Sequence, residues 1–211
     1  MQMDFASSRL DGMAAWSCRL ASARAPQRLG QIWLSACRLP DLVFPAQAQW
    51  HQVQVLDSRL DGCDLSGAVL TQCAFVRSVL DGLRAVALRA PYLSFWQCSL
   101  RGADLSQAEL EGANFEDADL TDAKLVSSNL QRSRLVRARC GGARFVDARL
   151  SQADASHLQA GDADFSGSQF DLVNVHDAQL GQARWDGCDR RRLRQTDPVL
   201  LQAQQWHPTK P

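Results

Sequence analysis

The sequence predicts an all-β solenoid, a square parallel β-helix of about nine coils that ends in a short C-terminal α-helix. Three observations predict it. An apolar residue recurs at every fifth position from Val55 to Trp185, at all 27 positions. The residue two places before each of these centres is small or apolar and never charged. Phenylalanine recurs at a spacing of twenty, at Phe75, Phe95 and Phe115. Repetition at a fixed period is typical of a repeat fold.

The period of five combines one short strand with one turn. In each five residues, two inward-facing side chains flank one outward-facing residue, which is the alternation of a strand. The other two residues turn the chain, and glycine often takes the second place, as at Gly62, Gly82 and Gly102, because glycine adopts turn conformations that other residues reach only at a cost. Each five therefore forms one side and one corner of a coil, and the coils stack by backbone hydrogen bonds.

The spacing of aromatic residues distinguishes a square coil from a triangular one. Phe145, Phe165 and Trp185 are again twenty apart, whereas no two phenylalanines are fifteen apart. Four sides per coil follow, with aromatic ladders on the inner walls. Where the centre shrinks to Ala85, the residue two places before grows to Leu83, as a close-packed interior of constant volume requires.

The repeats carry a recognisable consensus, A-(D/N)-L-x-x. It is matched at 103–105, 113–115, 118–120 and 163–165, which read ADL, ANF, ADL and ADF. The sequence thereby resembles the pentapeptide-repeat proteins over roughly residues 10–188. The resemblance implies a right-handed square β-helix. It says little about function, because the repeat encodes shape rather than chemistry.

The repeat predicts one β-helical domain over residues 1–190 with two shifts of register. Before residue 53 the centres Leu29, Leu34 and Leu39 come one residue early. A one-residue deletion is therefore expected near 21–27 and a compensating insertion in 45–52, with distorted coils or a small loop there.

The pattern stops after Cys188, and residues 191–211 are expected to form a capping helix and tail. Asp197 before Pro198 is an N-cap followed by proline at the first helical position. We expect this helix to cover the open edge of the last coil. A homodimer through that end of the solenoid, as in some members of the family that the sequence resembles, stays open.

Composition narrows the function classes. Lys+Arg and Asp+Glu balance at 23 each, which argues against direct nucleic-acid binding. No apolar run approaches the ~18 residues of a membrane span, and the N-terminus lacks the design of a signal peptide. The seven cysteines occupy inward positions without metal-binding spacing, so we expect free thiols and a cytoplasmic location.

Catalytic motifs are missing from the sequence. There is no phosphate-binding loop, dinucleotide fingerprint, zinc-protease motif or nucleophile elbow. The four histidines lie on turns, in the insertion and in the tail. We therefore expect no enzyme activity, no cofactor and no metal.

Charges are segregated along the solenoid in two bands. Residues 101–123 hold seven acids and one base, and residues 124–149 hold seven bases and one acid. The candidate charged residues are Asp104, Glu109, Glu116 and Asp119 in the first band and Arg134, Arg139, Arg144 and Arg149 in the second. The four arginines replace the consensus Asp/Asn on successive sides. Either the bands pair across neighbouring coils or they face a partner.

One edge carries apolar residues where the repeat predicts polar ones. The residue after the centre is apolar along one column, at Trp16, Leu56, Val76 and Trp96, and Tyr92 lies one corner away. Contiguous exposed tryptophans indicate a binding surface. The alternative is that the N-terminal segment or the 45–52 loop covers this edge.

The leading hypothesis is a non-catalytic rigid scaffold for protein–protein interaction in a bacterial cytoplasm. The family resemblance adds a role as a secretion-system-associated adaptor or effector accessory. It also implies the alternative, a DNA mimic that binds DNA gyrase or topoisomerase IV, as quinolone-resistance proteins do. That mimicry needs continuous negative potential, which the arginine band interrupts.

Overall fold

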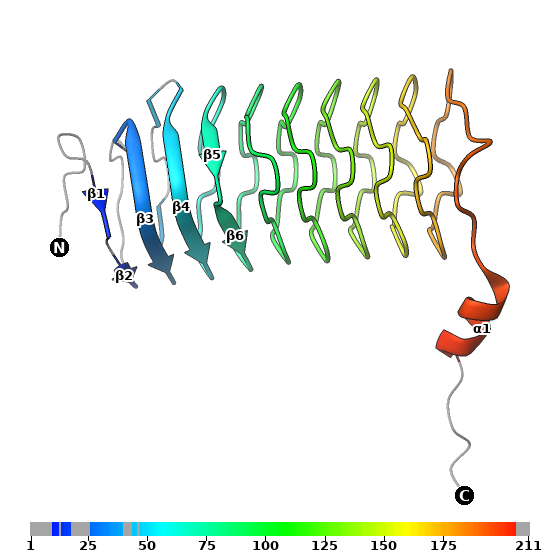
Figure 1. Ribbon diagram of the computed structural model, residues 1–211, viewed down its shortest axis with the longest axis horizontal. Helices are drawn as coiled ribbons and strands as arrows, with labels where there is room; N and C mark the ends of the chain where they lie inside the picture. The colour runs from blue at the N-terminus through cyan, green and yellow to red at the C-terminus, as the bar shows by residue number, and fades with distance from the viewer. Residues whose placement is uncertain (1–9, 13, 18–25, 40–43, 46, 206–211) are drawn as a thin grey trace, which may run out of the picture.

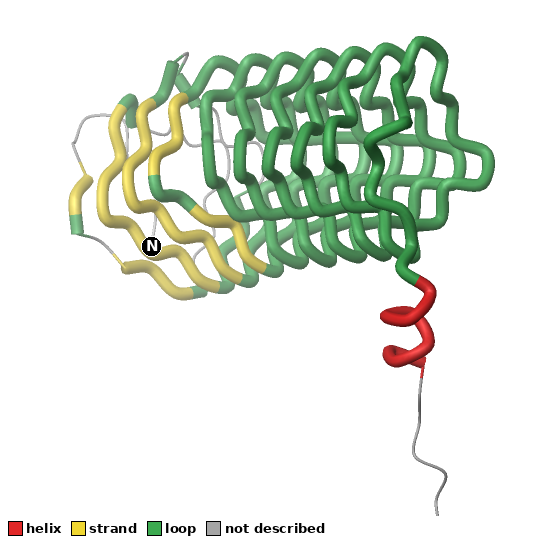
Figure 2. Tube along the Cα trace, turned by 45° about the vertical axis from the view of Figure 1, so that its right-hand side comes forward, coloured by secondary structure: helices red, strands yellow, loops and turns green. Residues whose placement is uncertain are grey.

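The protein is a rod of stacked coils with a helix at its C-terminal end (Figures 1 and 2). This computed structural model describes residues 10–12, 14–17, 26–39, 44–45 and 47–205. The elements are β1 (Leu10–Asp11), β2 (Ala14–Trp16), β3 (Arg28–Ser35), β4 (Gln49–Leu56), β5 (Val69–Thr71), β6 (Ala74–Val76) and α1 (Pro198–Gln205). All the strands pair in parallel in one sheet, with β3 and β4 at its centre.

Beyond β6 the coils are joined by single parallel bridges, one for each side. The bridges Asp64↔Arg84, Val69↔Arg89, Ala74↔Ser94 and Val79↔Ser99 join four successive sides to the next coil. Each bridge links residues twenty positions apart, so a coil has twenty residues and four sides. The square parallel β-helix predicted from the aromatic spacing is confirmed.

The register of the first coils differs from this regular spacing. Leu10 pairs with Leu29, and Leu29 pairs with Trp50, so the first two steps are 19 and 21 residues long. Trp50 pairs with Leu70, which restores the spacing of twenty. Phe44 and Ala48 are both buried, so both keep inward positions of the repeat. The one-residue insertion predicted in 45–52 therefore belongs to the turn between them. Most of the 21–27 segment lies outside the described residues.

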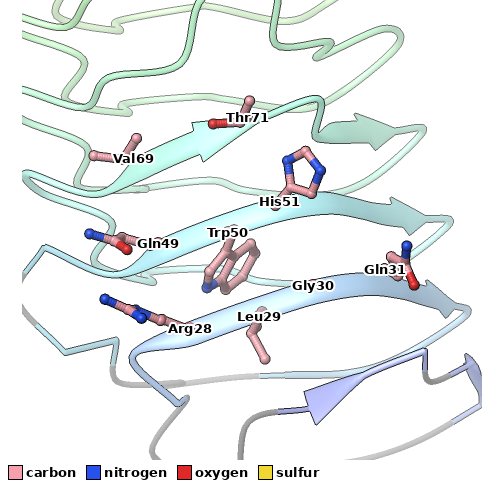
Figure 3. Close-up of a pocket in the computed structure, with 9 residues that line it drawn as sticks. All are labelled: Arg28, Leu29, Gly30, Gln31, Gln49, Trp50, His51, Val69 and Thr71. Atoms are coloured by element: carbon pink, nitrogen blue, oxygen red, sulfur yellow. The ribbon is translucent and has the colours of Figure 1, made fainter.

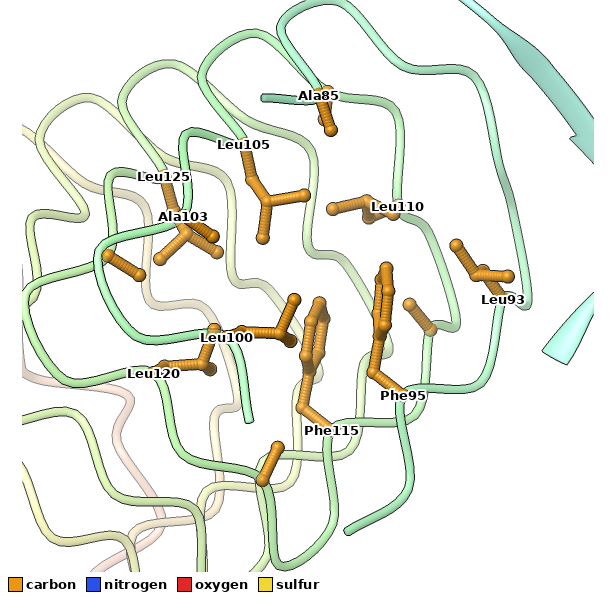
Figure 4. Packing of buried hydrophobic residues seen from close by; sticks show 14 of the residues in the cluster. Ala85, Leu93, Phe95, Leu100, Ala103, Leu105, Leu110, Phe115, Leu120 and Leu125 are labelled. Atoms are coloured by element: carbon orange, nitrogen blue, oxygen red, sulfur yellow. The ribbon is translucent and has the colours of Figure 1, made fainter. Parts of the chain in front are cut away.

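The interior is filled by aromatic ladders and leucines (Figure 4). Phe95 stacks between Phe75 and Phe115, with ring centroids 5.5 and 5.3 Å apart. A second ladder joins Phe165 to Phe145 at 4.9 Å and to Trp185 at 4.7 Å. Like residues stack because every coil repeats the same backbone path, and such ring pairs add stability beyond their burial.

The second residue of most corners adopts a left-handed backbone conformation. Gly112 has a φ of 68°, and Tyr92, one coil earlier in the same column, has a φ of 61°. This conformation costs an L-residue about 1–2 kcal/mol and glycine little. It explains why glycine recurs at this place in the repeat.

Helix α1 begins where the sequence predicts. The Asp197 carboxylate accepts the N–H groups of Val199 and Leu200 at 2.9 and 3.2 Å. However, α1 lies to one side of the last coil (Figures 1 and 2), and Leu180 and Trp185 of that coil are only partly buried. The helix therefore does not take the covering position that we expected from the sequence.

The cysteines differ in one respect from the expectation of free thiols. Cys73, Cys98, Cys140 and Cys188 are free, and burial raises the pKa of Cys73 to about 11 and that of Cys98 to about 12. Cys37 is disulfide-bonded, so the expectation is wrong at that position. Cys73, Cys98 and Cys140 are buried packing residues whose raised pKa disfavours the reactive thiolate, whereas Cys188 is partly exposed.

Among the described residues, no helix has both the length and the apolar character that crossing a membrane requires.

Candidate interaction surface

The amino-terminal part of one side of the rod carries no charge, and we call it the uncharged face. Its central column lies on β2, β3, β4, β6 and the side that follows, and it is flanked by two corner columns. The central residues are Ala14, Trp33, Gln54, Ala74 and Ser94. The flanking residues are Trp16, Ser35, Leu56, Val76 and Trp96 at one corner and Gln31, Gln52, Gln72 and Tyr92 at the other.

The candidate residues of the apolar edge lie together on this face. Trp16 pairs with Ser35, Ser35 with Leu56, and Leu56 with Val76. The carbonyl of Trp96 accepts the N–H of Arg77 at 3.0 Å, which places Trp96 next in the column. The Trp16 side chain is 68% exposed, whereas Leu56, Val76 and Trp96 are half-buried.

The predicted covering of this edge by the 45–52 loop does not occur among the described residues. Residues 49–56 form β4, which is itself part of the sheet. The turn before it connects the buried Phe44 to the buried Ala48 on other sides of the coil. Tyr92 is 71% exposed and Trp16 68%, so both ends of the uncharged face are open to solvent.

Trp33 is a member of the face that the sequence reasoning missed. It is 47% exposed and pairs with Ala14 on one side and Gln54 on the other. The sequence prediction followed only the corner position after each centre, whereas Trp33 stands before the centre Leu34. A tryptophan in the place of the consensus Asp/Asn was the available signal.

Glutamine side chains in the middle of the uncharged face are hydrogen-bonded to one another and to the backbone. The Gln52 side chain donates to the Gln72 side-chain oxygen at 3.0 Å. The Gln54 side chain donates to the backbone carbonyl of Gln72 at 3.2 Å. These bonds run between neighbouring coils, so they fix the amides along the rod axis.

A shallow hollow of 460 Å³ lies next to the uncharged face, around the corner formed by Gly30 and Gln31 (Figure 3). Its polar side chains come from Arg28, Gln31, Gln49, His51 and Thr71. Its lining includes no carboxylate, thiol or second imidazole, so it offers no acid–base pair. Within the part of the chain that the structure describes, no cluster of three His, Cys, Asp or Glu residues could hold a metal ion.

The two charged bands neutralise each other across neighbouring coils. The Arg134 guanidinium lies 2.8 Å from Glu116, and Arg137 bridges Glu116 and Asp117 at 2.6 and 2.7 Å. Looser contacts join Lys124 to Asp104 in the neighbouring coil at 4.0 Å and Arg149 to Glu109 two coils away at 3.7 Å. Arg144 stands between Lys124 and Asp164 in its column. The pairing alternative of the sequence analysis is thus the one that the side chains adopt.

Asp119 is the most enclosed of the candidate charged residues. Its side chain is only 6% exposed, between Arg139 at 2.9 Å and Arg101 at 3.4 Å. Burial by itself raises the pKa of Asp119, but the Thr121 hydrogen bonds and the two arginines outweigh burial and hold that pKa below its usual value.

Square coils of twenty residues with small and apolar residues facing inward define the class of pentapeptide-repeat β-helices. A family model described as Pentapeptide repeats matches eight copies, over residues 98–135 and 133–171. Residues 98–171 are therefore pentapeptide repeats, and the coils that flank them share the same spacing of twenty residues.

Solved structures of the same kind resemble this chain. HetL, a protein involved in heterocyst differentiation regulation from the cyanobacterium Nostoc sp. strain PCC 7120, is 22% identical, with a TM-score of 0.45 over 93% of this chain and 92% of that one. A trypsin-treated variant of QnrB1, a plasmid-mediated fluoroquinolone resistance protein, is 14% identical, with a TM-score of 0.49 over 94% of this chain and 100% of that one. Likeness at this level does not extend to what these proteins bind. A comparison with curated proteins finds no match.

Proposed function

We propose that this protein is a rigid, non-catalytic scaffold for protein–protein interaction that presents the uncharged face to a partner protein. The supporting observation is the exposure of Trp16, Trp33 and Tyr92 on one contiguous face. Tryptophan and tyrosine contribute large contact areas and are enriched in interface hot spots. Strand β2 pairs with β3, β3 also pairs with β4, and Ser94 beside Tyr92 bridges both neighbouring coils. The face is therefore held rigid before the partner binds, which lowers the entropy cost of association.

The setting that we propose is the bacterial cytoplasm. A scaffold of this kind would serve as a secretion-system-associated adaptor or effector accessory, which is the role implied by the family resemblance. A homodimer through the carboxy-terminal end is a further element of the proposal. Leu180 and Trp185 remain partly exposed there, and Val199 of α1 is 74% exposed.

The competing proposal, a DNA mimic that binds gyrase or topoisomerase IV, ranks second. A mimic needs unpaired negative charges along the rod as substitutes for phosphates. Glu116, Asp117 and Asp119 instead contact arginines of the next coil within 3 Å. An acidic surface that is neutralised in this way presents little negative potential to a basic DNA-binding saddle.

The double variant Trp16→Ala, Trp33→Ala tests the scaffold function. Capture of partner proteins from a native lysate is expected to be lost while the melting temperature stays unchanged, because both side chains are exposed. Leu172→Ala is the matched control, since Leu172 is an exposed apolar residue outside the uncharged face. Capture that survives in the double variant, or a large fall in its melting temperature, would contradict the proposal.

A further inference from the structure

In the middle of the uncharged face, on β3, β4 and β6, the backbone is hydrogen-bonded along both edges, whereas β2 at the amino-terminal end pairs only with β3 among the described residues. Strand β4 pairs with β3 on one side and with β5 and β6 on the other. The N–H of Arg77 donates to the carbonyl of Trp96, so the ladder continues into the next coil. A ligand that lies over these middle coils therefore cannot join the sheet as an added strand, and side chains must hold it there.

The face is long and narrow. Its five coils, from the coil of Trp16 to that of Trp96, span four steps, or about 19 Å at the usual strand spacing. From Tyr92 to Trp96 the width is about 13 Å, and the area is about 250 Å². A stable interface between globular proteins buries ~800 Å² on each partner. The face by itself is too small for a folded domain or a second copy of this chain, and it suits a linear segment.

The side chains of the face select an uncharged ligand that accepts hydrogen bonds. None of its residues is charged, and the nearest charges, Asp57 and Arg77, pair with each other at 2.7 Å. A charged group placed against the face would lose hydration without finding a partner. The indole N–H groups, the Tyr92 hydroxyl and the glutamine amides are all able to donate, and carbonyl oxygens are their natural acceptors.

We propose that the uncharged face binds an extended, uncharged, proline-rich segment of the partner protein in the polyproline II conformation; this inference rests on the proposed scaffold function. Proline lacks an N–H group, so such a segment leaves few backbone donors unpaired over coils whose strands are already paired on both edges. Polyproline II rises ~3.1 Å per residue, and about six residues match the ~19 Å length. Proline rings pack on aromatic side chains.

The aromatic residues stand where such a segment would need them. Trp16 and Trp33 lie at the amino-terminal end of the face, and Tyr92 and Trp96 lie at its other end. Between them the central column holds Gln54 and Ala74. The ligand would lie over these smaller side chains, with its prolines against the aromatic groups at both ends.

Titration of the full chain with a synthetic nine-residue peptide, (Ala-Pro-Pro)₃, tests the inference by calorimetry and tryptophan fluorescence. Saturable binding is expected, weakened about tenfold or more by Trp33→Ala and by Tyr92→Ala. The Leu172→Ala control is expected to bind like the parent chain. A peptide of the same length made of glycine and serine is expected not to bind.

Two results would overturn the inference. One is no binding of the proline peptide at millimolar concentration, or binding that the Trp33 and Tyr92 variants leave unchanged. The other is variant-sensitive binding of a neutral oligosaccharide, maltohexaose, without binding of the peptide, which would assign the face to carbohydrate. If the peptide fails to bind but Trp16→Ala, Trp33→Ala still abolishes partner capture, the scaffold function stands and only the ligand class is wrong.

Discussion

The ring of Tyr92 lies directly over the backbone of Gly112 in the next coil. A Cβ atom built on Gly112 would approach Cδ1 and Cε1 of Tyr92 to 2.5 Å, which is closer than packed atoms come. The tyrosine can therefore lie flat along the corner column only because a glycine follows it one coil later. This glycine positions one end of the uncharged face.

Gly112→Ala is expected to displace the Tyr92 ring. Gly102→Ala is the matched variant. Gly102 has a φ of 62°, close to the 68° of Gly112, but no atom lies within 4 Å of a Cβ built on Gly102. Both variants carry the cost of a left-handed alanine, about 1–2 kcal/mol, and Gly112→Ala should lose roughly 1 kcal/mol more through crowding. Urea unfolding measures both. Addition of Tyr92→Ala should remove the difference, and equal losses in the two single variants would contradict the contact.

Substitutions of Phe95 test how much the aromatic ladder contributes to the stability of the fold. It is fully buried and stacked on both faces, so Phe95→Ala should cost about 3–5 kcal/mol. Phe95→Asp should leave the chain unfolded, because a buried carboxylate would have no partner. Phe95→Leu should retain the fold at an intermediate cost. Denaturant unfolding followed by circular dichroism orders the three variants, and a folded Phe95→Asp protein would refute the packing.

Asp119 should contribute stability that depends on pH. Its pKa is lower in the folded chain than its usual value, so its stabilisation is complete above the unfolded pKa of ~3.9 and is lost as the pH falls through the lower folded pKa. At pH 7, Asp119→Asn should cost about 1–2 kcal/mol. The difference between variant and parent in urea unfolding should shrink in acid.

The control for Asp119 is Asp64→Asn, which removes a solvent-exposed carboxylate 3.6 Å from Arg84. Exposed ion pairs contribute ~0–1 kcal/mol, so this variant should change stability little at either pH. If Asp119→Asn behaves like Asp64→Asn at pH 7, the enclosed carboxylate does not stabilise the fold.

His176 should hold α1 against the last coil. Its Nδ1 accepts the N–H of Asp197 at 3.2 Å, and its Nε2 lies 3.1 Å from the Gln204 side-chain oxygen. His176→Ala removes both contacts, so amide hydrogen exchange in residues 197–205 should quicken. His157→Ala is the control, because His157 pairs with Asp177 at 3.0 Å instead. Exchange that stays slow in His176→Ala would show that other contacts hold the helix.

A supercoiling assay with DNA gyrase distinguishes the proposed scaffold from the DNA mimic. The chain is expected to leave supercoiling by gyrase unchanged at micromolar concentration, because its acids are paired across coils. The triple reversal Asp104→Lys, Glu116→Lys, Asp119→Lys serves as the control. Inhibition or protection of gyrase by the parent chain that this reversal abolishes would favour the DNA mimic.

The sequence by itself determined the square coil, the inward ladders and the start of α1. Each depends on a local rule that repeats: inward and outward residues alternate over three positions, a turn takes the next two, and Asp197 caps the helix from its own side chain. The same rule placed Trp16, Leu56 and Val76 in one column, because the strand register carries a residue's position from coil to coil.

Only the tertiary structure decided which outward side chains contact one another and which of them become buried. Asp119 is enclosed because Arg101 and Arg139 reach it from the coils on either side. His176 is buried because a segment about twenty residues later folds back on it. Arginine side chains are long and can reach several neighbours, and α1 has left the repeat, so the five-residue pattern carries no information about either contact.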